Sequence, residues 1–243
     1  MVKINEYSTF KILVIIPAYN EEENIEKVID NLQRRVPEVD YVIINDCSRD
    51  KTREVCRKNS FNYIDLPVNL GIGGGVQAGY QYALKNGYDI AIQNDGDCQH
   101  DPTYIKDVVS PIIDGQADIV IGSRFVTGEG FQSTGVRRIG INILSGLIKL
   151  WCGVRVKDVT SGYRGVNRKF IEIYASEYAQ DYPEPEAIIS GAMNGAKIME
   201  VPVVMHERTG GASSISAWRS LYYMVKVSLA IIMYRPTLTR RCK

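Results

Sequence analysis

The sequence has no surplus of either charge. Its 243 residues include 29 Lys and Arg and 28 Asp and Glu, which gives a formal net charge of +1 at pH 7. Proteins that coat nucleic acid need a net basic face, because binding releases counterions from the phosphates. We therefore expect no nucleic-acid partner, and any phosphate-binding site has to be local. Hydrophobic residues make up 45% of the chain, which is ordinary for a globular protein and excludes a disordered one.

Cysteine pairs and long apolar runs are also missing. The five cysteines are scattered and form no C-x-x-C pair, so we expect neither a zinc or redox site nor export to an oxidising compartment. Ile12 to Ile16 is too short for the core of a signal peptide. Leu221 to Tyr234 is interrupted by Lys226 and falls short of the roughly 20 residues of a transmembrane helix. These absences predict a cytoplasmic protein that does not cross the bilayer.

Strand and helix patterns alternate along the first half of the chain. The β-branched and leucine run at 12–16 is typical of a strand buried on both faces. We expect Asn20 to cap the helix that follows and Asp101 to open a later one. The patterns predict strands at 12–16, 41–44, 61–66, 89–93 and 118–123, and helices at 21–32, 50–59, 76–85, 102–113 and 139–151. This order predicts an α/β fold, with a doubly wound, mostly parallel sheet covered by helices on both faces.

Polar side chains follow four of the predicted strands. In an open parallel sheet, ligands bind beyond the carboxyl ends of the strands, so these segments are expected to meet in one crevice. The sharpest signal is Asp95-Gly96-Asp97, in which residues two apart at a strand end point to the same side. Two adjacent carboxylates repel unless a cation holds them, and Mg²⁺ or Mn²⁺ bridged to substrate phosphates is the usual solution. The polar segments are 17–21, 45–50, 94–101 and 123–124.

Six motifs occur in a fixed order between about Ile12 and Ser214. They are Pro17-Ala18-Tyr19-Asn20-Glu21, Asn45-Asp46-Cys47-Ser48-x-Asp50-x-Thr52, Asn69-x-Gly71, Asp95-x-Asp97-x-Gln99-His100-Asp101-Pro102, Gly122-Ser123-Arg124 and Asp158-x-x-Ser161-Gly162-Tyr163-Arg164. In this order the sequence resembles the family 2 glycosyltransferases, and among them the polyprenyl-phosphate branch typified by dolichyl-phosphate mannosyltransferase. The resemblance implies a GT-A fold that binds a nucleoside diphosphate sugar, with a UDP-sugar favoured.

The resemblance also implies roles for individual residues. Asp95 and Asp97 would hold Mg²⁺ or Mn²⁺, and Asp97 and Arg124 would act in catalysis, because the departing nucleoside diphosphate develops negative charge that a cation and an arginine neutralise. The expected donor-binding residues are Pro17, Ala18, Tyr19, Asn20, Glu21, Asp46, Gly71, Asp95, Gly96, Asp97 and Gln99.

The residues leave the acceptor open. A phosphate monoester is largely dianionic at neutral pH and needs arginines more than a base, whereas a sugar hydroxyl needs a carboxylate to take its proton. Asp158, Glu184 and Glu186 are the candidate bases, of which Asp158 and Glu186 are the preferred ones. The expected acceptor-binding residues are Arg124, Arg137, Arg138, Ser161, Arg164 and Arg208. We therefore predict an inverting transferase that uses a polyprenyl phosphate in cell-envelope polysaccharide or glycoconjugate synthesis, with a hydroxyl of a lipid-linked glycan as the alternative.

The sequence departs from the branch at three places. Asn45 stands where an aspartate is usual, Cys47 replaces a common glycine, and the segment 206–214 lacks the expected lysine, which puts one phosphate contact in doubt. Two other functions fit less well. A nucleotidyltransferase would carry a basic glycine-rich loop after its first strand, and an accessory binding protein derived from a transferase would have lost one of the essential acids.

The domain boundaries follow from the same motifs. We expect a GT-A domain at 1–214, with a nucleotide-sugar half at 1–124 and an acceptor half at 125–214, and an amphipathic helical tail at 215–243. Aromatic and basic residues mix in the tail, as they do at membrane interfaces. It would place the protein peripherally at the inner face of the cell membrane. Packing on the domain, on a small membrane partner protein or on a second copy of the chain is the alternative for the tail. The helix expected at 139–151 is open in the same way, between contact with the membrane and core or oligomer packing.

Overall fold

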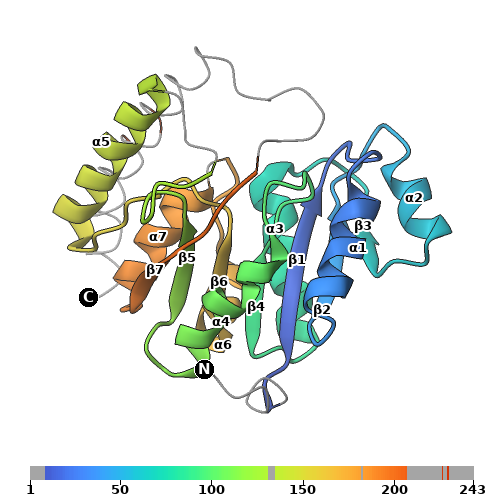
Figure 1. Ribbon diagram of the computed structural model, residues 1–243, viewed down its shortest axis with the longest axis horizontal. Helices are drawn as coiled ribbons and strands as arrows, with labels where there is room; N and C mark the ends of the chain where they lie inside the picture. Colours follow the sequence, from blue (N-terminus) through green and yellow to red (C-terminus); the bar gives the residue numbers. More distant parts are fainter. Residues whose placement is uncertain (1–8, 131–134, 182, 207–225, 227–228, 230–243) are drawn as a thin grey trace.

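The described part of the computed structural model comprises residues 9–130, 135–181 and 183–206, with Lys226 and Leu229. It contains one seven-stranded sheet in the order β3-β2-β1-β4-β6-β5-β7 (Figure 1). β6 runs antiparallel to β4 and β5, and the other pairs are parallel. The strands are β1 (Ile12–Ala18), β2 (Asp40–Asn45), β3 (Tyr63–Asp65), β4 (Ile90–Gln93), β5 (Ile119–Ser123), β6 (Arg164–Asn167) and β7 (Ile198–Pro202). The predicted mostly parallel α/β sheet is confirmed.

Helices cover both faces of this sheet. Along β1, Leu13 and Ile15 belong to one apolar core with α3, α5, α6 and α7, while Val14 and Ile16 belong to a second core with α1 and α4. Successive strand residues point to opposite faces, so a strand that is covered on both sides reads as a continuous apolar run. The helices are α1 (Ile25–Arg35), α2 (Thr52–Lys58), α3 (Gly71–Lys85), η2 (Pro102–Tyr104), α4 (Ile105–Ile113), α5 (Gly135–Cys152), α6 (Arg168–Ser176) and α7 (Pro183–Met193).

Two local predictions need correction. Asn20 does not cap the first helix: α1 begins at Ile25, and Asn20 lies in the left-handed region at φ 58°, where its Oδ1 accepts a bond from the Arg49 N–H (2.8 Å). The helix expected at 76–85 begins at Gly71, so it includes the cluster of Gly71, Gly73, Gly74 and Gly75, whose sequence predicts a turn before the helix. A Cβ at Gly73 would lie 2.1 Å from the Ala179 carbonyl oxygen, so the glycines serve close packing of α3 rather than a turn. The Asp101 cap is confirmed, because its Oδ1 accepts from the Thr103 N–H (2.9 Å).

The antiparallel strand β6 brings the second half of the chain to the functional edge. In its register with β4, Arg164 lies opposite Gln93. The residues that precede Arg164 therefore lie beside the residues that follow Gln93, which include the Asp95-Gly96-Asp97 segment. No helix in the described ranges is both long and apolar enough to cross a membrane.

Candidate functional site

Three loops with strained backbone meet at the carboxyl ends of β1, β2 and β4. Asn20, Cys47 and Cys98, one on each loop, have φ values of 58°, 55° and 64°. Non-glycine residues in this left-handed region cost free energy, and such strain clusters at functional sites. Cys47 stands where the family commonly has glycine, and its backbone conformation is one that glycine adopts without strain. Cys47 therefore adopts the left-handed backbone conformation that a glycine would have at this position.

The loop after β1 and the loop after β2 are bonded to each other. The Asp46 N–H donates to the Ala18 carbonyl (2.9 Å), and the Asn20 N–H donates to Ser48 Oγ (3.0 Å). Pro17 and Ala18 end β1, and the Tyr19 side chain beside them is exposed. The Glu21 carboxylate is buried instead and accepts from Asn24 Nδ2 (2.8 Å). Tyr19 thus presents a ring to solvent beside Asp46, whereas Glu21 supports the loop from inside.

Asp46 is held at the start of α3. Its Oδ1 accepts from the Leu70 N–H (2.6 Å), and its carbonyl accepts from Asn69 Nδ2 (3.0 Å). Burial raises the pKa of the Asp46 carboxyl, and the backbone N–H groups of Leu70 and Gly71 act in the opposite direction. Gly71 therefore lies next to Asp46, another of the expected donor-binding residues.

The Asp95-Gly96-Asp97 loop is fixed by contacts from both sides. Asp95 Oδ1 accepts from Gln93 Nε2 (3.2 Å), and the Asp95 N–H donates to Nδ1 of the buried His100 (3.0 Å). Asp97 Oδ1 accepts from the Gln99 N–H (3.1 Å). Because His100 Nδ1 is an acceptor here, the ring proton sits on Nε2, which lies 3.7 Å from Asp95 Oδ2. His100 thus holds the backbone of Asp95, while its Nε2 faces the Asp95 carboxylate.

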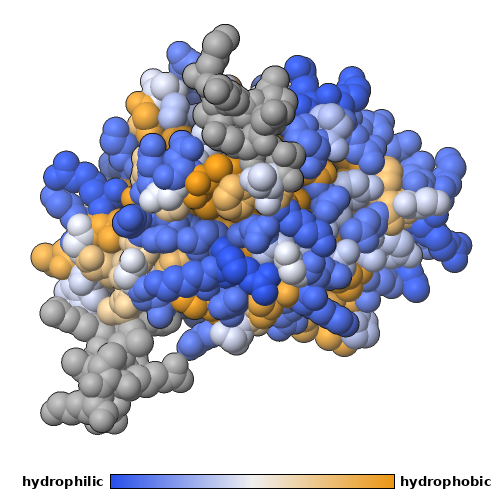
Figure 2. Space-filling model, turned by 90° about the horizontal axis from the view of Figure 1, so that it is seen from below, coloured by the Kyte–Doolittle hydropathy of each residue, from blue (hydrophilic) through white to orange (hydrophobic). Residues whose placement is uncertain are grey.

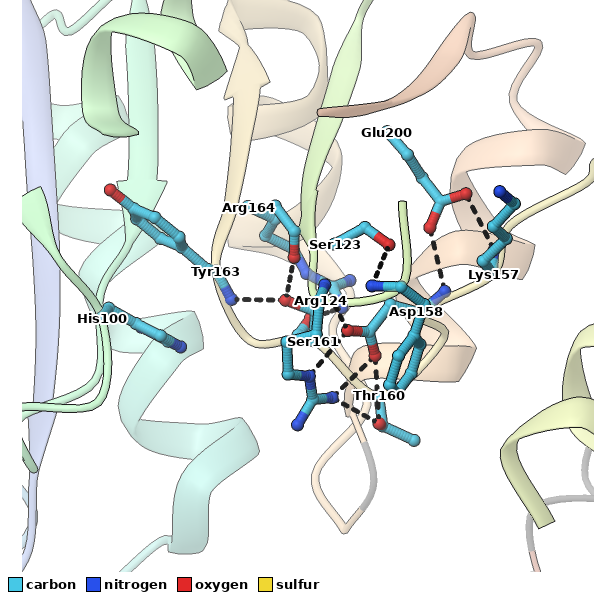
Figure 3. Close-up of polar contacts among 12 residues, drawn as sticks. His100, Ser123, Arg124, Lys157, Asp158, Thr160, Ser161, Tyr163, Arg164 and Glu200 are labelled. Carbon is cyan, nitrogen blue, oxygen red and sulfur yellow. Dashed lines mark hydrogen bonds and ion pairs between the residues drawn. The ribbon is translucent and has the colours of Figure 1, made fainter. Parts of the chain in front are cut away.

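A stacked ring joins this loop to the segment before β6. The His100 and Tyr163 rings are stacked, with their centroids 4.7 Å apart and an interplanar angle of 14° (Figure 3). The Tyr163 hydroxyl donates to the Asp101 carbonyl (3.1 Å). Gly162 lies against the same loop: a Cβ there would be 2.9 Å from Gln93 Nε2 and 3.1 Å from Asp95 Oδ2. A side chain at position 162 would therefore have to displace the Gln93 amide and the Asp95 carboxylate.

The same segment holds Arg124 at the end of β5. Arg124 Nε and Nη2 donate to the two carboxylate oxygens of Asp158, both at 2.7 Å, and Nη2 also donates to Thr160 Oγ1 (3.1 Å) (Figure 3). Both members of this ion pair are buried. Glu200 on β7 supports it by accepting from the Lys157 N–H (2.8 Å) and the Asp158 N–H (2.9 Å). Asp158 therefore fixes the Arg124 guanidinium through two hydrogen bonds, and Glu200 on β7 holds Asp158 in place.

Ser161 and Arg164 lie beneath the surface rather than at it. Ser161 Oγ donates to the Gly122 carbonyl (2.6 Å). Arg164 is fully buried, and its guanidinium donates to the carbonyls of Ser161 (2.7 Å) and Glu184 (3.1 Å). In this structure neither side chain reaches a space in which an acceptor phosphate could contact it. Their bonds instead join the 158–164 segment to β5 and α7.

The remaining acceptor-side predictions are spread over α5 and α7. The Arg138 guanidinium carbon lies 3.3 Å from the centre of the Phe125 ring, and Phe125 follows Arg124 in the chain. Glu186 is half-buried on α7, and burial and Asp181 raise the pKa of its carboxyl while Lys226 lowers it. Arg208, the Arg137 side chain and all of the tail 215–243 except Lys226 and Leu229 lie outside the described residues.

The sequence model of Glycosyl transferase family 2 matches residues 13–174, which include the loops after β1, β2 and β4 and the Arg124–Asp158 pair. The chain belongs to this family. The resemblance seen in the motifs is thereby confirmed.

Relatives of this family 2 transferase are similar over most of their length. Polyprenol monophosphomannose synthase of Mycolicibacterium smegmatis is 27% identical, with 90% of this chain and 86% of the relative covered. Undecaprenyl-phosphate mannosyltransferase of Micrococcus luteus is 29% identical, with 85% and 88% covered. The UDP-N-acetylglucosamine–dolichyl-phosphate N-acetylglucosaminyltransferase of Methanococcus voltae is 31% identical, with 79% and 84% covered. All three relatives are consistent with the polyprenyl-phosphate branch that the motifs indicate.

Solved structures confirm the fold of the transferase. Glucosyl-3-phosphoglycerate synthase from Mycobacterium tuberculosis in complex with phosphoglyceric acid superposes with a TM-score of 0.73 at 21% identity, covering 95% of this chain and 81% of that one. The same enzyme in complex with Mn²⁺, UDP and phosphoglyceric acid gives 0.70 at 21% identity, with 95% and 80% covered. At this identity the likeness supports the GT-A fold alone.

The Asp95-Gly96-Asp97 loop of the transferase fits a hard divalent cation. Asp95 and Asp97 supply two carboxylates on one loop, and no group of three or more His, Cys, Asp or Glu side chains within the described ranges is arranged around a metal position. Mg²⁺ and Mn²⁺ are commonly held by one or two carboxylates together with substrate phosphates and water. The carboxylate pair therefore suits a cation that arrives with a nucleoside diphosphate.

Several contributors to the transferase site were missed by sequence reasoning. His100 and Gly162 stand inside recognised motifs, but their contacts with Asp95 depend on the β4–β6 register. Glu200 has no local signal: it lies 42 residues from Asp158, on a short strand without a motif. Only a polar residue inside an otherwise apolar strand pattern could have marked it.

We expect Gly162→Ala to lower transfer by about 10-fold or more, chiefly through a raised KM for the donor, because the added methyl would displace the Asp95 carboxylate. Steady-state kinetics with varied nucleotide sugar would measure it. Gly146→Ala is the matched control, since a Cβ there meets nothing within 4 Å. Equal kinetics for the two variants would contradict the close-approach role of Gly162.

Proposed function

We propose that the chain is an inverting, divalent-metal-dependent transferase that moves a sugar from a nucleoside diphosphate, with UDP favoured, to a polyprenyl phosphate. The observation that carries the proposal is the 158–163 segment, which contacts Asp95 at one end and Arg124 at the other. The segment thereby links the Asp95 and Asp97 carboxylates to the Arg124 guanidinium. Relatives named for polyprenol, undecaprenyl and dolichyl phosphates, and structural neighbours with bound UDP and Mn²⁺, support the substrate classes.

On the donor side, each residue has a role that its position suits. Tyr19 offers its exposed ring to the base, and Asp46, with Pro17, Ala18, Asn20 and Gly71 around it, faces the ribose. Gly96 lets the diphosphate approach the backbone. Asp95 and Asp97 would hold Mg²⁺ or Mn²⁺, which when bound stabilises negative charge on the leaving diphosphate. Gln99 lies on the same loop, beside Asp97.

Arg124 is the second electrostatic element. Its bidentate pair with Asp158 holds the guanidinium in one orientation, so little reorganisation is needed as charge develops on the leaving group. In the proposed step an acceptor oxygen forms a bond to the anomeric carbon while the bond from that carbon to the diphosphate oxygen breaks, which inverts the configuration. Asp158 is engaged by Arg124, which favours a positioning role for it over that of a base.

A phosphate acceptor suits the residues around this centre. A phosphate dianion is already a nucleophile and requires positive charge to position it. We assign that role to Arg124, Arg137, Arg138 and Arg208, while Ser161 and Arg164 hold the segment from below. In this proposal residues 1–124 form the donor half of a 1–214 domain, residues 125–214 form the acceptor half, and the tail 215–243 contacts the membrane or a partner at the inner face of the cell membrane.

One observation favours a second candidate, transfer to a hydroxyl of a lipid-linked glycan. Glu186 is half-buried and its pKa is raised by burial and by Asp181, which makes its carboxylate a stronger base. A hydroxyl acceptor needs such a base, whereas a phosphate acceptor does not. Glu186→Gln separates the two candidates, because it should abolish transfer to a hydroxyl and leave transfer to a phosphate nearly unchanged.

The direct test is an assay of purified protein with a panel of UDP- and GDP-sugars, Mn²⁺ and undecaprenyl phosphate. We expect release of nucleoside diphosphate that depends on the lipid phosphate, a product of inverted anomeric configuration, and loss of activity on chelation that Mn²⁺ restores. Donor turnover with glycan acceptors alone would overturn the lipid-phosphate assignment. Full turnover after chelation would overturn the metal requirement.

A further inference from the structure

Two guanidiniums from different elements lie over the ring of Phe125. The guanidinium carbon of Arg138, in the first turn of α5, is 3.3 Å from the ring centre. The guanidinium carbon of Arg124, directly after β5, is 5.2 Å from it. Arginine is attracted to an aromatic face because the face carries a negative electrostatic potential. The ring therefore holds two like charges as neighbours at the end of β5.

The ring itself is anchored in the core. Phe125 is 7% exposed and belongs to the same apolar cluster as Ile141 and Leu144 on the buried side of α5. Its N–H donates to Ser123 Oγ at the end of β5 (3.4 Å). The core thus fixes the position of the ring, and the ring in turn limits where the Arg138 guanidinium can lie.

The charges of the two arginines are balanced differently. Arg124 is paired with Asp158, and this pair is formally neutral. Arg138 forms no ion pair with the side chains that the structure describes. Arginine stays charged in proteins, so among these three side chains Arg138 supplies the net positive charge.

Arg138 is also unusually covered for a charged side chain. Hydrophilic residues predominate on the face drawn in Figure 2, as expected where charged side chains extend into water. Arg138 is instead half-buried, and its Nη1 is shielded from solvent without a hydrogen-bond partner among the described residues. A buried donor without an acceptor is costly, so a ligand that supplies an acceptor oxygen would stabilise this arrangement.

A ring suits an anion-binding arginine better than a carboxylate does. A carboxylate holds an arginine by accepting from its N–H groups, and it repels a second anion. A ring attracts the guanidinium through its face, which leaves the N–H groups in the guanidinium plane available to phosphate oxygens. A phosphate monoester is largely dianionic at neutral pH, so it binds best to an arginine whose charge is not already matched. The contact of Arg138 with Phe125 meets both conditions.

We propose that Phe125 is a positioning residue, which holds Arg138 beside Arg124 so that the acceptor phosphate meets a net positive charge at the transfer centre. The inference rests on the proposed lipid-phosphate acceptor and identifies the residue that orients its phosphate-binding arginine. Phe125 touches neither the donor nor the phosphate in this proposal, because it acts through Arg138.

Incorporation of trifluorophenylalanine at position 125 tests this role in the full-length protein. Fluorination nearly keeps the shape of the side chain and removes most of the negative potential of its face. We expect the KM for a water-soluble prenyl monophosphate to rise about tenfold, with the KM for the nucleotide sugar and the Tm nearly unchanged. The same replacement at Phe170 is the matched control, because Phe170 is buried in the same core and lies under Lys169 on α6. It should leave both KM values unchanged.

A double-mutant cycle tests whether Phe125 acts through Arg138. Phe125→Leu and Arg138→Met should each raise the KM for the monophosphate, and the double variant should be no worse than Arg138→Met alone. Additive effects of the two substitutions would overturn the positioning role. Equal effects of fluorination at Phe125 and at Phe170 would overturn it as well, and this comparison does not depend on how well Phe125→Leu folds.

Calorimetric titration with the prenyl monophosphate separates this inference from the proposed function. Suppose that the wild type binds the monophosphate, that Arg138→Met and fluorination at Phe125 both weaken binding, and that sugar is transferred only to glycan hydroxyls. The phosphate site then stands and the acceptor assignment falls. Transfer to a polyprenyl phosphate, with affinity and KM unchanged by fluorination at Phe125, would refute the role of Phe125 and leave the proposed function standing.

Discussion

Asp97→Ala is expected to lower kcat/KM for sugar transfer by at least about 10²-fold. Asp97 presents a carboxylate from the loop after β4, two residues from Asp95, and its Oδ1 is oriented by the Gln99 N–H. Removing it halves the carboxylate set proposed for the cation, so charge on the leaving diphosphate loses its strongest stabilisation. Initial rates of nucleoside diphosphate release with saturating Mn²⁺ would measure the effect.

The same variant should leave the fold intact, because Asp97 lies on a partly exposed loop outside both apolar cores. Asp114→Ala is a suitable control, since it removes an exposed carboxylate at the end of α4. We expect wild-type rates and wild-type thermal stability for the control. Retained transfer in Asp97→Ala, together with an unchanged requirement for Mn²⁺, would refute the role assigned to Asp97.

Asp158→Asn is expected to destabilise the protein by about 3–5 kcal/mol, because it leaves the buried Arg124 guanidinium without its counter-charge. For a chain of this size that corresponds to a fall in Tm of roughly 6–20 °C. The pair is bidentate, and both side chains are shielded from water, so solvent cannot replace the lost carboxylate. Thermal unfolding followed by circular dichroism would measure the change.

An exposed ion pair provides the comparison for Asp158. Glu172→Gln breaks the contact of Glu172 with Arg168 on the surface of α6, and surface pairs of this kind contribute about 0.3–0.5 kcal/mol. If Asp158→Asn abolished transfer while its Tm stayed within the range of Glu172→Gln, Asp158 would be a base rather than a positioning residue. A large stability loss with residual transfer is the result that the bidentate pair predicts.

The strands of the first half were predictable because each is locally distinctive. β1 and β4 are buried on both faces, and a strand with two covered faces needs an unbroken apolar run such as Ile12 to Ile16. The observed ends of these strands differ from the predicted ends by no more than two residues. The start of α3 shifted further, by five residues. A cluster of glycines is typical of a turn, and the reason for glycine here is close packing against the backbone of Ala179 and Gln180, which lie about a hundred residues further along the chain.

The second half was less predictable. β6 is four residues long, begins with a buried arginine and lacks an apolar run, so its sequence carries no strand signal. β7 lies at the edge of the sheet and contains only half-buried and exposed residues. Both strands exist because neighbouring strands offer hydrogen-bonding partners, which is a property of the assembled sheet and not of the segment.

The sequence by itself determined the α/β class, the family and the position of the carboxylate pair, because each depends on residue types at short spacings. Only the tertiary structure decided that Asp158 pairs with Arg124, that Glu200 supports the pair, and that Arg164 is an interior residue. These contacts join residues 34 and 42 positions apart through an antiparallel strand inserted into a parallel sheet. Local spacing reports which face of an element is buried, whereas the partner that a buried charge meets depends on how distant elements are ordered in the sheet.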